Sequence, residues 1–147
     1  MIHDVISDQK GVLWIATQSG LVKFDGNDYI RFHPDTEDTT TIGTILTFKL
    51  YEDVEGNIWI GFMDDIYKYN PYSKSFKRFP FEHLVDFPEY GQPSVYTIAP
   101  GSHRRIYFGI ASFICAKVNN AMVYYDTKNN QLQLFGYHQK LEKKLNS

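Results

Sequence analysis

The sequence predicts an all-β chain of about three four-stranded antiparallel blades, which form an incomplete β-propeller or part of a larger one. Three observations support this prediction. A segment containing aspartate, glycine and tryptophan occurs twice in the 147-residue chain, and its two copies are 45 positions apart. Each copy divides into short segments rich in β-branched and aromatic residues, with turn residues between them. Tyrosine, phenylalanine and tryptophan make up 16% of the chain, and wide rings fill the wedge between splayed blades.

The repeat sets the expected blade boundaries. Four residues match at an offset of 45, and they are Asp8, Gly11, Trp14 and Ile15 in the first copy and Asp53, Gly56, Trp59 and Ile60 in the second. In a third copy Tyr107 matches Trp59 at an offset of 48. Farther along this copy, Met122–Asp126 matches Ile66–Asn70 at an offset of 56. This rise indicates an insertion of eight residues near 113–121. We therefore expect one propeller segment over residues 1–147, with blades at about 2–33, 44–80 and 94–136 and a tail at 137–147.

Turn chemistry divides each copy into strands. The strands expected in the second copy are Ile45–Glu52, Asn57–Phe62, Asp65–Asn70 and Ser75–Phe79. The turn before its second strand begins with an aspartate that can bind backbone amides and ends with a glycine that tolerates positive φ. The third copy has Gly101-Ser102-His103-Arg104 at this place, so we expect a differently built turn there.

The second strand of each copy is apolar without interruption, as in Leu13–Thr17 and Ile58–Phe62. Such a strand is typical of a sheet that is covered on both faces. The last strands, Tyr29–Phe32 and Phe76–Phe79, place polar residues between apolar ones. Each unit is therefore expected to be buried inside and solvated outside, as in a propeller blade.

At these residues the sequence resembles the two-component regulator propeller repeat. That repeat has an Asp-x-x-Gly turn, a Leu/Ile-Trp-Ile-Gly-Thr strand, a Gly-Leu strand and a Tyr/Phe-Asp ending. The first copy shows Asp8 and Gly11 in the turn, followed by Leu13-Trp14-Ile15-Ala16-Thr17, Gly20-Leu21 and Phe24-Asp25. The second copy has Asp65-Ile66 in place of Gly-Leu, and the third lacks the tryptophan. The resemblance covers about residues 2–80 well and 95–136 loosely.

The resemblance implies a function. Repeats of this family form the periplasmic, extracytoplasmic sensor region of hybrid two-component systems, which respond to carbohydrate fragments and carry a histidine kinase elsewhere. We accordingly expect a sensor segment that binds an oligosaccharide, without catalysis, cofactor or metal. Its expected partners are the remaining propeller blades or a second copy of the chain. The segment from Met1 to Ile6 has no basic or apolar leader pattern, so no signal peptide is expected within these residues.

Composition excludes several other functions. The formal net charge of −2 argues against nucleic-acid binding, which needs a basic surface. No run of apolar residues is long enough to cross a bilayer, so no membrane contact is expected from this segment. No motif of a hydrolase, phosphate-binding loop or zinc enzyme occurs. A propeller lyase would need catalytic histidines or metal ligands, and the five histidines show no such spacing. The single cysteine, Cys115, is expected to be an inert small hydrophobe.

The candidate binding residues lie where the third copy departs from the repeat. The loop from Pro80 to Pro93 is long and carries Phe87 and Tyr90, and the insertion carries Phe113. Because propeller ligands bind at loops or in the central channel, we expect these three residues to form the recognition surface. The two tryptophans could stack on sugars, but their place in apolar strands favours packing between blades. The two repeated aspartates could act as paired carboxylates, but their shared turn position favours a structural role.

Two alternatives remain open in the sequence. Three blades leave open edges, so the chain could instead be a structural or interaction module that assembles through those edges. The tail from Tyr137 to Ser147 could be a short docked helix or a frayed end, because eleven residues form only a marginal helix alone.

Overall fold

The computed structural model describes residues 1–35, 37–38, 40–44, 46–85, 93–114 and 117–137 of the chain. Within them, three four-stranded antiparallel sheets follow one another along the sequence. The strands of blade 1 are β1 (Ile2–Ser7), β2 (Leu13–Thr17), β3 (Gly20–Phe24) and β4 (Tyr29–Phe32). Those of blade 2 are β5 (Thr47–Glu52), β6 (Ile58–Phe62), β7 (Asp65–Asn70) and β8 (Ser75–Pro80). Those of blade 3 are β9 (Ser94–Pro100), β10 (Ile106–Ile114), β11 (Lys117–Asp126) and β12 (Gln131–Tyr137).

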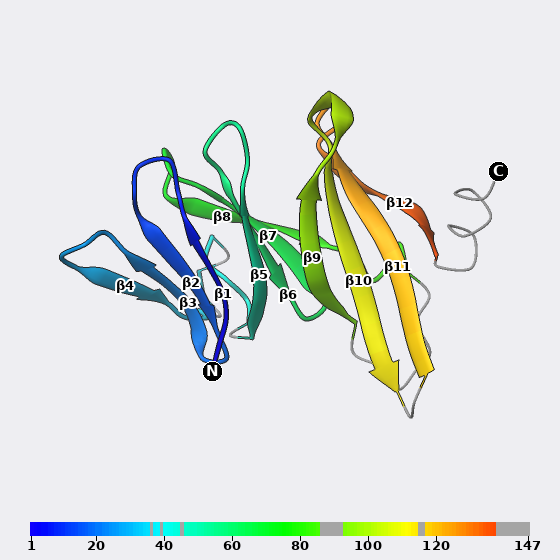
Figure 1. Ribbon diagram of the computed structural model, residues 1–147, viewed down its shortest axis with the longest axis horizontal. Coiled ribbons are helices and arrows are strands. Elements are labelled where there is room, and N and C mark those ends of the chain that lie inside the picture. Colours follow the sequence, from blue (N-terminus) through cyan, green and yellow to red (C-terminus); the bar gives the residue numbers. More distant parts are fainter. Residues whose placement is uncertain (36, 39, 45, 86–92, 115–116, 138–147) are drawn as a thin grey trace.

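These sheets are propeller blades, and they lie side by side like the ribs of a fan (Figure 1). Each sheet is a simple meander in which neighbouring strands are consecutive in sequence. The first strands come together, because β1 contacts β5 and β5 contacts β9. The all-β prediction of three four-stranded blades is therefore confirmed. The part of the chain that the structure describes contains no helix long and apolar enough to cross a membrane.

Two apolar clusters hold the blades together, one at each seam. The cluster between blades 1 and 2 is built around Trp14, and the cluster between blades 2 and 3 is built around Trp59. Trp59 packs against Phe79 of its own blade and against Phe108 and Tyr125 of blade 3, with ring centroids 5.6, 5.6 and 4.7 Å away. Many of the aromatic residues therefore pack between blades.

The two faces of blade 1 differ, and this corrects one expectation. The apolar strand β6 is buried at every residue, as a sheet covered on both faces requires. In β2 only Trp14 and Ala16 are buried, whereas Leu13, Ile15 and Thr17 are half-buried. The expectation that β2 is covered on both faces is wrong for the described chain. Blade 2 covers one face of blade 1, and no described element covers the other.

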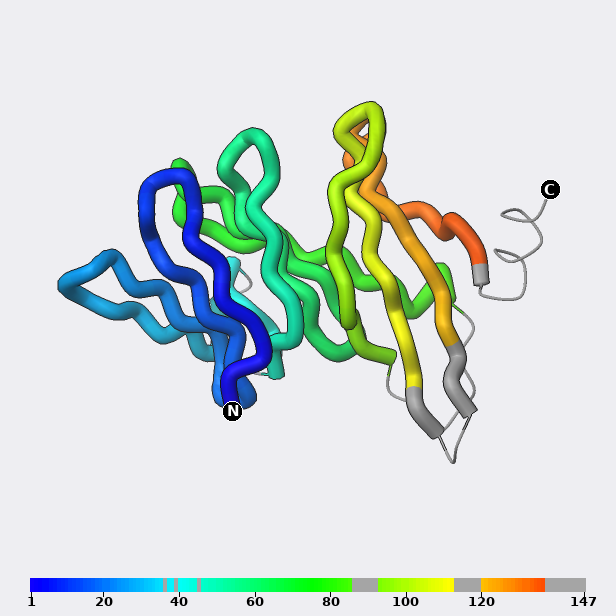
Figure 2. The backbone as a smooth tube through the Cα atoms, viewed as in Figure 1, coloured from blue at the N-terminus to red at the C-terminus, as the bar shows by residue number. Residues whose placement is uncertain are grey.

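The insertion in the third copy is a regular hairpin, not an irregular segment. Strands β10 and β11 continue their antiparallel pairing past Ile110↔Ala121 as far as Ile114↔Lys117. The tube in Figure 2 shows the described parts of these two strands running side by side. Cys115 and the expected tail beyond Tyr137 lie outside the described residues, as does Ile45, the first residue of the strand predicted at Ile45–Glu52.

Candidate functional site: a pocket between blades 2 and 3

The repeated aspartate turn shapes one end of the blades. Asp53 Oδ1 accepts hydrogen bonds from the backbone amides of Glu55 and Asn57, each at 2.9 Å. Its Oδ2 accepts a 2.8 Å hydrogen bond from the indole Nε1 of Trp59. Asp8 makes the same set of bonds in blade 1, including a 3.0 Å bond from Trp14 Nε1. Both carboxylates are thus fully engaged in fixing a turn and orienting an indole.

The glycines and tryptophans of the motif have matching structural positions. Gly11 and Gly56 have φ angles of 78° and 79°, the left-handed region that their turns require. Trp14 and Trp59 are 1% and 0% exposed, so neither ring offers a face to a sugar. Tyr107 stands at the register position of Trp59, but it is half-buried and lies on the face of blade 3 that points away from blade 2. The two glycines therefore shape the turns, and the two tryptophans pack in the seams between blades.

Blade 3 forms its turn without aspartate. Residues Ser102–Arg104 form a 3-10 turn, closed by hydrogen bonds between Gly101 and Arg105 and between Arg105 and Ser102. Arg104 stands at the place of Gly56 in the repeat and has a φ of 59°, which is also left-handed. A non-glycine residue in this conformation costs roughly 1 kcal/mol or more, and such positions concentrate at functional sites. The different turn that the sequence predicted therefore presents an arginine where the other blades have glycine.

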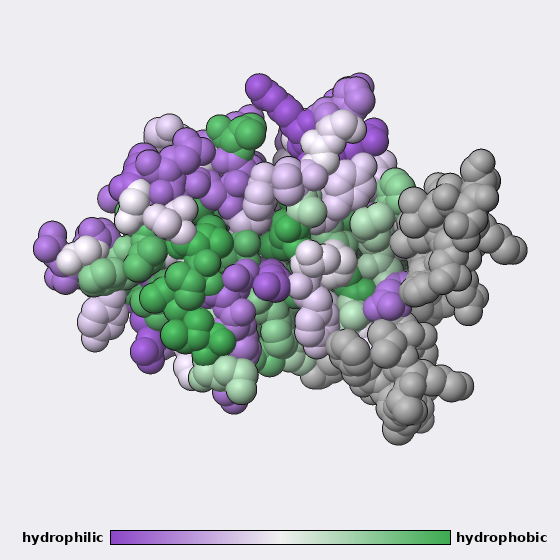
Figure 3. Space-filling model, viewed as in Figure 1, coloured by the Kyte–Doolittle hydropathy of each residue, from purple (hydrophilic) through white to green (hydrophobic). Residues whose placement is uncertain are grey.

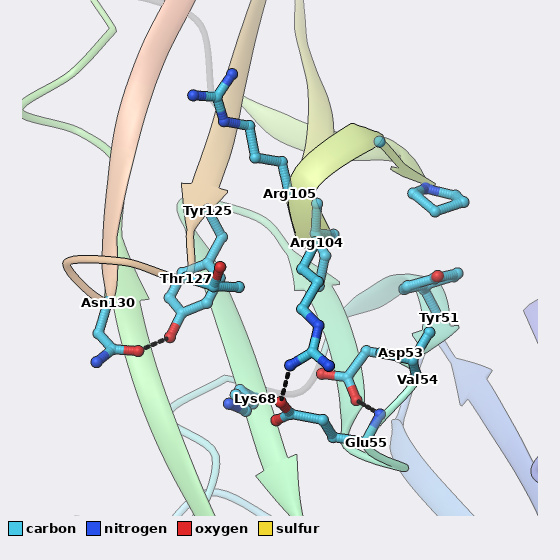
Figure 4. A pocket seen from close by; sticks show the side chains of 13 residues that line it. Tyr51, Asp53, Val54, Glu55, Lys68, Arg104, Arg105, Tyr125, Thr127 and Asn130 are labelled. Atoms are coloured by element: carbon cyan, nitrogen blue, oxygen red, sulfur yellow. Dashed lines mark hydrogen bonds and ion pairs between the residues drawn. The ribbon is translucent and has the colours of Figure 1, made fainter.

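A pocket of about 260 Å³ lies beside this turn, at the seam between blades 2 and 3. Its walls come from the β5–β6 turn, the turn before β10, and the β11–β12 turn (Figure 4). The side chains that argue for a binding role are Tyr51, Glu55, Lys68, Arg104, Tyr125 and Asn130. This volume lies just below the roughly 300–1,000 Å³ of pockets for drug-sized ligands, so the pocket suits a smaller molecule.

The charged groups at the mouth of the pocket are accessible to a ligand. Arg104 Nη1 lies 3.5 Å from Glu55 Oε1, and the two side chains are 70% and 60% exposed. A pair this exposed contributes roughly 1 kcal/mol at most, so a ligand can compete for either partner. In Figure 4 the side chain of Arg104 reaches toward Glu55, whereas Arg105 points away from both. Arg105 lies instead over the ring of Tyr124, at 4.9 Å from its centroid.

Aromatic rings and an amide complete the pocket. Lys68 Nζ lies 5.4 Å from the ring centroid of Trp59 and 5.7 Å from that of Tyr125. The Tyr125 hydroxyl donates a 2.7 Å hydrogen bond to Asn130 Oδ1. Burial, and then the charges of Glu55 and Asp53, raise the pKa of Tyr125, so its phenol stays neutral at physiological pH. The pocket thus combines apolar ring surface with charged and neutral hydrogen-bonding groups.

At the end of the blades where the pocket lies, the seam between blades 1 and 2 is built differently. There the carboxylate of Glu52 accepts hydrogen bonds of 3.1 and 3.0 Å from the backbone amide of Gln9, which joins the two blades. Pro100 takes the register position of Glu52 in blade 3 and cannot make this contact. A hollow of about 250 Å³ beside the Gln9 contact has no arginine in its lining. The pocket between blades 2 and 3 thus has an arginine at its mouth, which the hollow between blades 1 and 2 lacks.

The recognition surface predicted from the sequence stays a prediction. Phe87 and Tyr90 lie outside the described residues, and Phe113 belongs to β10 but its side chain is not among those described. Sequence reasoning missed the pocket, because it treated Gly101-Ser102-His103-Arg104 only as a differently built turn and not as part of a site. The available signal was the repeat itself, since arginine replaces glycine at Arg104. Among the described residues, no three histidine, cysteine, aspartate or glutamate side chains gather into a metal site.

Comparison with known proteins supports the fold. No family model matches the chain, and no curated protein does so either. Among solved structures, the extracellular domain of a hybrid two-component system, BT3049 from B. thetaiotaomicron, is similar with a TM-score of 0.62 and 14% identity. The match covers 92% of this chain and 24% of that domain. The chain therefore spans about a quarter of the length of the domain it resembles.

Weaker likenesses point to one further protein. Two structures of the extracellular domain of BT4673 from B. thetaiotaomicron match with TM-scores of 0.33 and 0.34 and identities of 12% and 13%. Both matches cover 92% of this chain and no more than 28% of the other. The likeness to the BT3049 domain, at 14% identity, therefore supports the fold of the chain alone.

Proposed function

We propose that the chain is part of an extracytoplasmic sensor propeller of a two-component system, and that it binds a carbohydrate fragment without catalysis. The observation that carries the proposal is the pocket between blades 2 and 3, where Arg104 replaces the glycine of the repeat. The repeat motif and the fold likeness to the extracellular domain of BT3049 support the sensor role.

The pocket chemistry favours a carbohydrate. Arginine and carboxylate side chains can each hydrogen-bond two neighbouring hydroxyl groups of a sugar, and Arg104 and Glu55 stand at the mouth with polar edges exposed. Tyr51 and Tyr125 add rings that carry a polar tip and an apolar body. A small neutral or acidic sugar fragment satisfies both kinds of group, whereas a purely apolar ligand leaves the charged groups without partners.

The test is a thermal-shift screen of oligosaccharide fragments, followed by titration calorimetry of any fragment that stabilises the chain. A ligand at a hundredfold excess over its Kd stabilises the folded state by about 2.7 kcal/mol. We expect Arg104→Gly to weaken binding at least about tenfold, because it removes a charge-assisted hydrogen bond. The same variant should keep or raise the melting temperature, because glycine adopts the left-handed conformation without strain.

The matched control is Lys74→Gly. Lys74 also has a left-handed φ, of 53°, but it lies in the β7–β8 turn and does not line the pocket. It should match Arg104→Gly in stability and leave binding unchanged. Binding by Arg104→Gly that equals wild type contradicts the pocket. If binding is instead lost in a triple alanine variant of Phe87, Tyr90 and Phe113, recognition belongs to the loop surface that the sequence predicted.

A further inference from the structure

A second cavity continues the pocket outward along the seam between blades 2 and 3. This outer cavity measures about 340 Å³, and its walls come from β8, the loop after β8 and the start of β12. Asn130 lines both the outer cavity and the pocket. In Figure 4 Asn130 and Lys68 lie on the side of the pocket away from Tyr51. The two cavities together therefore have room for a longer ligand than the pocket alone.

The charge of the lining changes from the pocket to the outer cavity. The pocket includes the carboxylate of Glu55 beside its basic groups. The described lining of the outer cavity has no carboxylate, and its ionisable side chains are Lys77, Arg78 and His83. The charge of Arg78 is already balanced, because its Nε donates a 2.8 Å hydrogen bond to Asp65 Oδ2. The exposed ammonium group of Lys77 is therefore the permanent charge that the outer cavity offers to a ligand.

Lys77 stands directly opposite a second lysine. In the register of β7 and β8 it pairs with Lys68, and both lie on the side of blade 2 that faces blade 3. Paired residues of antiparallel strands have Cα atoms roughly 4.5–5.5 Å apart, and like charges placed opposite each other destabilise a sheet. Lys68 Nζ lies 5.4 Å from the ring centroid of Trp59, and Lys77 Nζ lies 5.1 Å from that of Phe79. Among the described residues neither lysine takes part in an ion pair, so aromatic rings and not carboxylates hold this positive charge in place.

The lysine pair is particular to blade 2 within the described chain. The same two register positions hold Lys23 and Ile30 in blade 1, and Tyr124 and Gln133 in blade 3. Lys23 lies over the indole of Trp14, with its Nζ 5.6 Å from the ring centroid, as Lys68 does over the second tryptophan. A lysine over the indole is thus a feature that two blades share. Lys77 is an addition that the other blades do not repeat, and packing of the seam does not require it.

Neutral polar groups lie beside the lysine pair. Asn130 Oδ1 accepts the hydrogen bond from the Tyr125 hydroxyl, so its two amide hydrogens are left to donate to a ligand. Gln131 adds a second amide to the outer cavity. Figure 3 shows mostly hydrophilic side chains at the end of the blades that carries the turns of the pocket, and hydrophobic ones over the strands of blade 1. Cationic groups and amide donors on a polar surface suit a ligand that carries both hydroxyl groups and negative charge.

We propose that the ligand of this seam is an acidic oligosaccharide, in which a carboxylate or sulfate group contacts Lys68 and Lys77 while a neighbouring ring occupies the pocket beside Arg104. This inference rests on the proposed function and specifies its ligand. An anion beside two ammonium groups replaces their repulsion by two charge-assisted contacts. Because Lys68 lines the pocket and Lys77 the outer cavity, the pair also determines where along the ligand the negative charge falls.

Titration calorimetry with sugars that differ in charge tests the proposal. The probes are trimers of galacturonic, glucuronic and mannuronic acid, each beside its methyl ester, and sulfated galactose trimers beside their desulfated form. We expect an acidic probe to bind at least about tenfold more tightly than its uncharged counterpart. The difference should shrink as the salt concentration rises from about 0.05 to 0.5 M, because salt screens exposed charges.

Two matched variants locate the charge that the ligand meets. Lys77→Gln should weaken binding of the acidic probe about tenfold and leave binding of its uncharged form unchanged. It should not lower the melting temperature of the free chain, because it removes a like-charge contact from the sheet. Lys23→Gln is the control, since Lys23 also lies over an indole but lines neither cavity. It should bind both forms of the probe as the wild type does.

The outcomes separate this inference from the proposed function. Acidic and uncharged probes that bind equally, with binding lost in Arg104→Gly, overturn the inference and leave the proposed function standing. Tight binding of an acidic probe that Lys77→Gln leaves unchanged overturns the inference as well, because the negative charge then binds elsewhere. A chain that binds no sugar of either kind overturns the proposed function and the inference with it.

Discussion

At the residue scale, one carboxylate organises each of the first two blades. Asp53 holds two backbone amides of its turn and the indole of Trp59, so it links the local turn to the seam between blades. The indole is fully buried and its Nε1 needs an acceptor, because an unsatisfied buried donor is costly. The aspartate is therefore required by packing and turn geometry together.

We predict that Asp53→Ala destabilises the chain by about 3 kcal/mol, because it leaves the buried Trp59 Nε1 and two turn amides without their acceptor. Urea unfolding followed by tryptophan fluorescence measures this loss. Asp126→Ala is the control, since Asp126 accepts one hydrogen bond in an exposed turn, from the Lys128 amide at 2.9 Å. It should cost less than about 1 kcal/mol. Equal losses for the two variants would contradict the organising role of Asp53.

The residues that the sequence identified are those whose roles are local. The Asp53 turn could be predicted because its bonds span only six residues, and spacing alone determines them. The pocket could not be predicted in this way. It forms where the turns of blade 3 lie beside the β5–β6 turn of blade 2. Its lining therefore brings Pro100 together with residues such as Tyr51 that are far away in the sequence. The left-handed conformation of Arg104 can be connected with the pocket only when the arrangement of the blades is known.

At the element scale, the seams require close approach of strands. A Cβ atom added to Gly61 of β6 would lie 2.6 Å from Cγ1 of Val95 in β9. Ala16 holds the corresponding place in β2 and is fully buried. The strand boundaries in blade 2 were close to those predicted from turn residues. The length of the β10–β11 hairpin was not predicted, because an insertion in a sequence alignment does not reveal whether its two halves pair.

We predict that Gly61→Ala destabilises the seam between blades 2 and 3 by about 1–3 kcal/mol, because the new methyl group overpacks it. Val95→Ala alone should cost about 1–3 kcal/mol through the cavity that it leaves. The double variant should lose less than the sum of the two, because the smaller side chain makes room for part of the methyl group. Thermal unfolding of all four proteins completes the cycle, and strict additivity would contradict direct contact between the two positions.

At the scale of the whole molecule, blade 2 is the centre of the fan. Both of its faces are covered, and every residue of β6 is buried. Blades 1 and 3 are each covered on one face within the described chain. Stability is therefore expected to fall from the middle blade toward both ends, as in other repeat architectures whose units contact only their neighbours.

Hydrogen–deuterium exchange should reveal this gradient. We predict that the amides of β6 and β7 exchange slowest and that those of β2 and β3 exchange faster, because blade 2 is covered on both faces and blade 1 on one face within the described chain. Strand β3 is the informative one, because it lies inside its sheet with hydrogen-bonded neighbours on both sides. Equal protection of β3 and β7 would contradict stabilisation of the blades by their seams.

The central functional claim is that a ligand enters the seam between blades 2 and 3. Amide nuclear magnetic resonance of the chain, titrated with an oligosaccharide that raises its melting temperature, tests this claim most directly. We expect the largest shifts to fall together on the three turns around the pocket, which are Asp53–Gly56, Gly101–Arg105 and the turn from Thr127 to Asn130. Shifts confined to residues 80–93 and 113–121, with these turns unchanged, would contradict it.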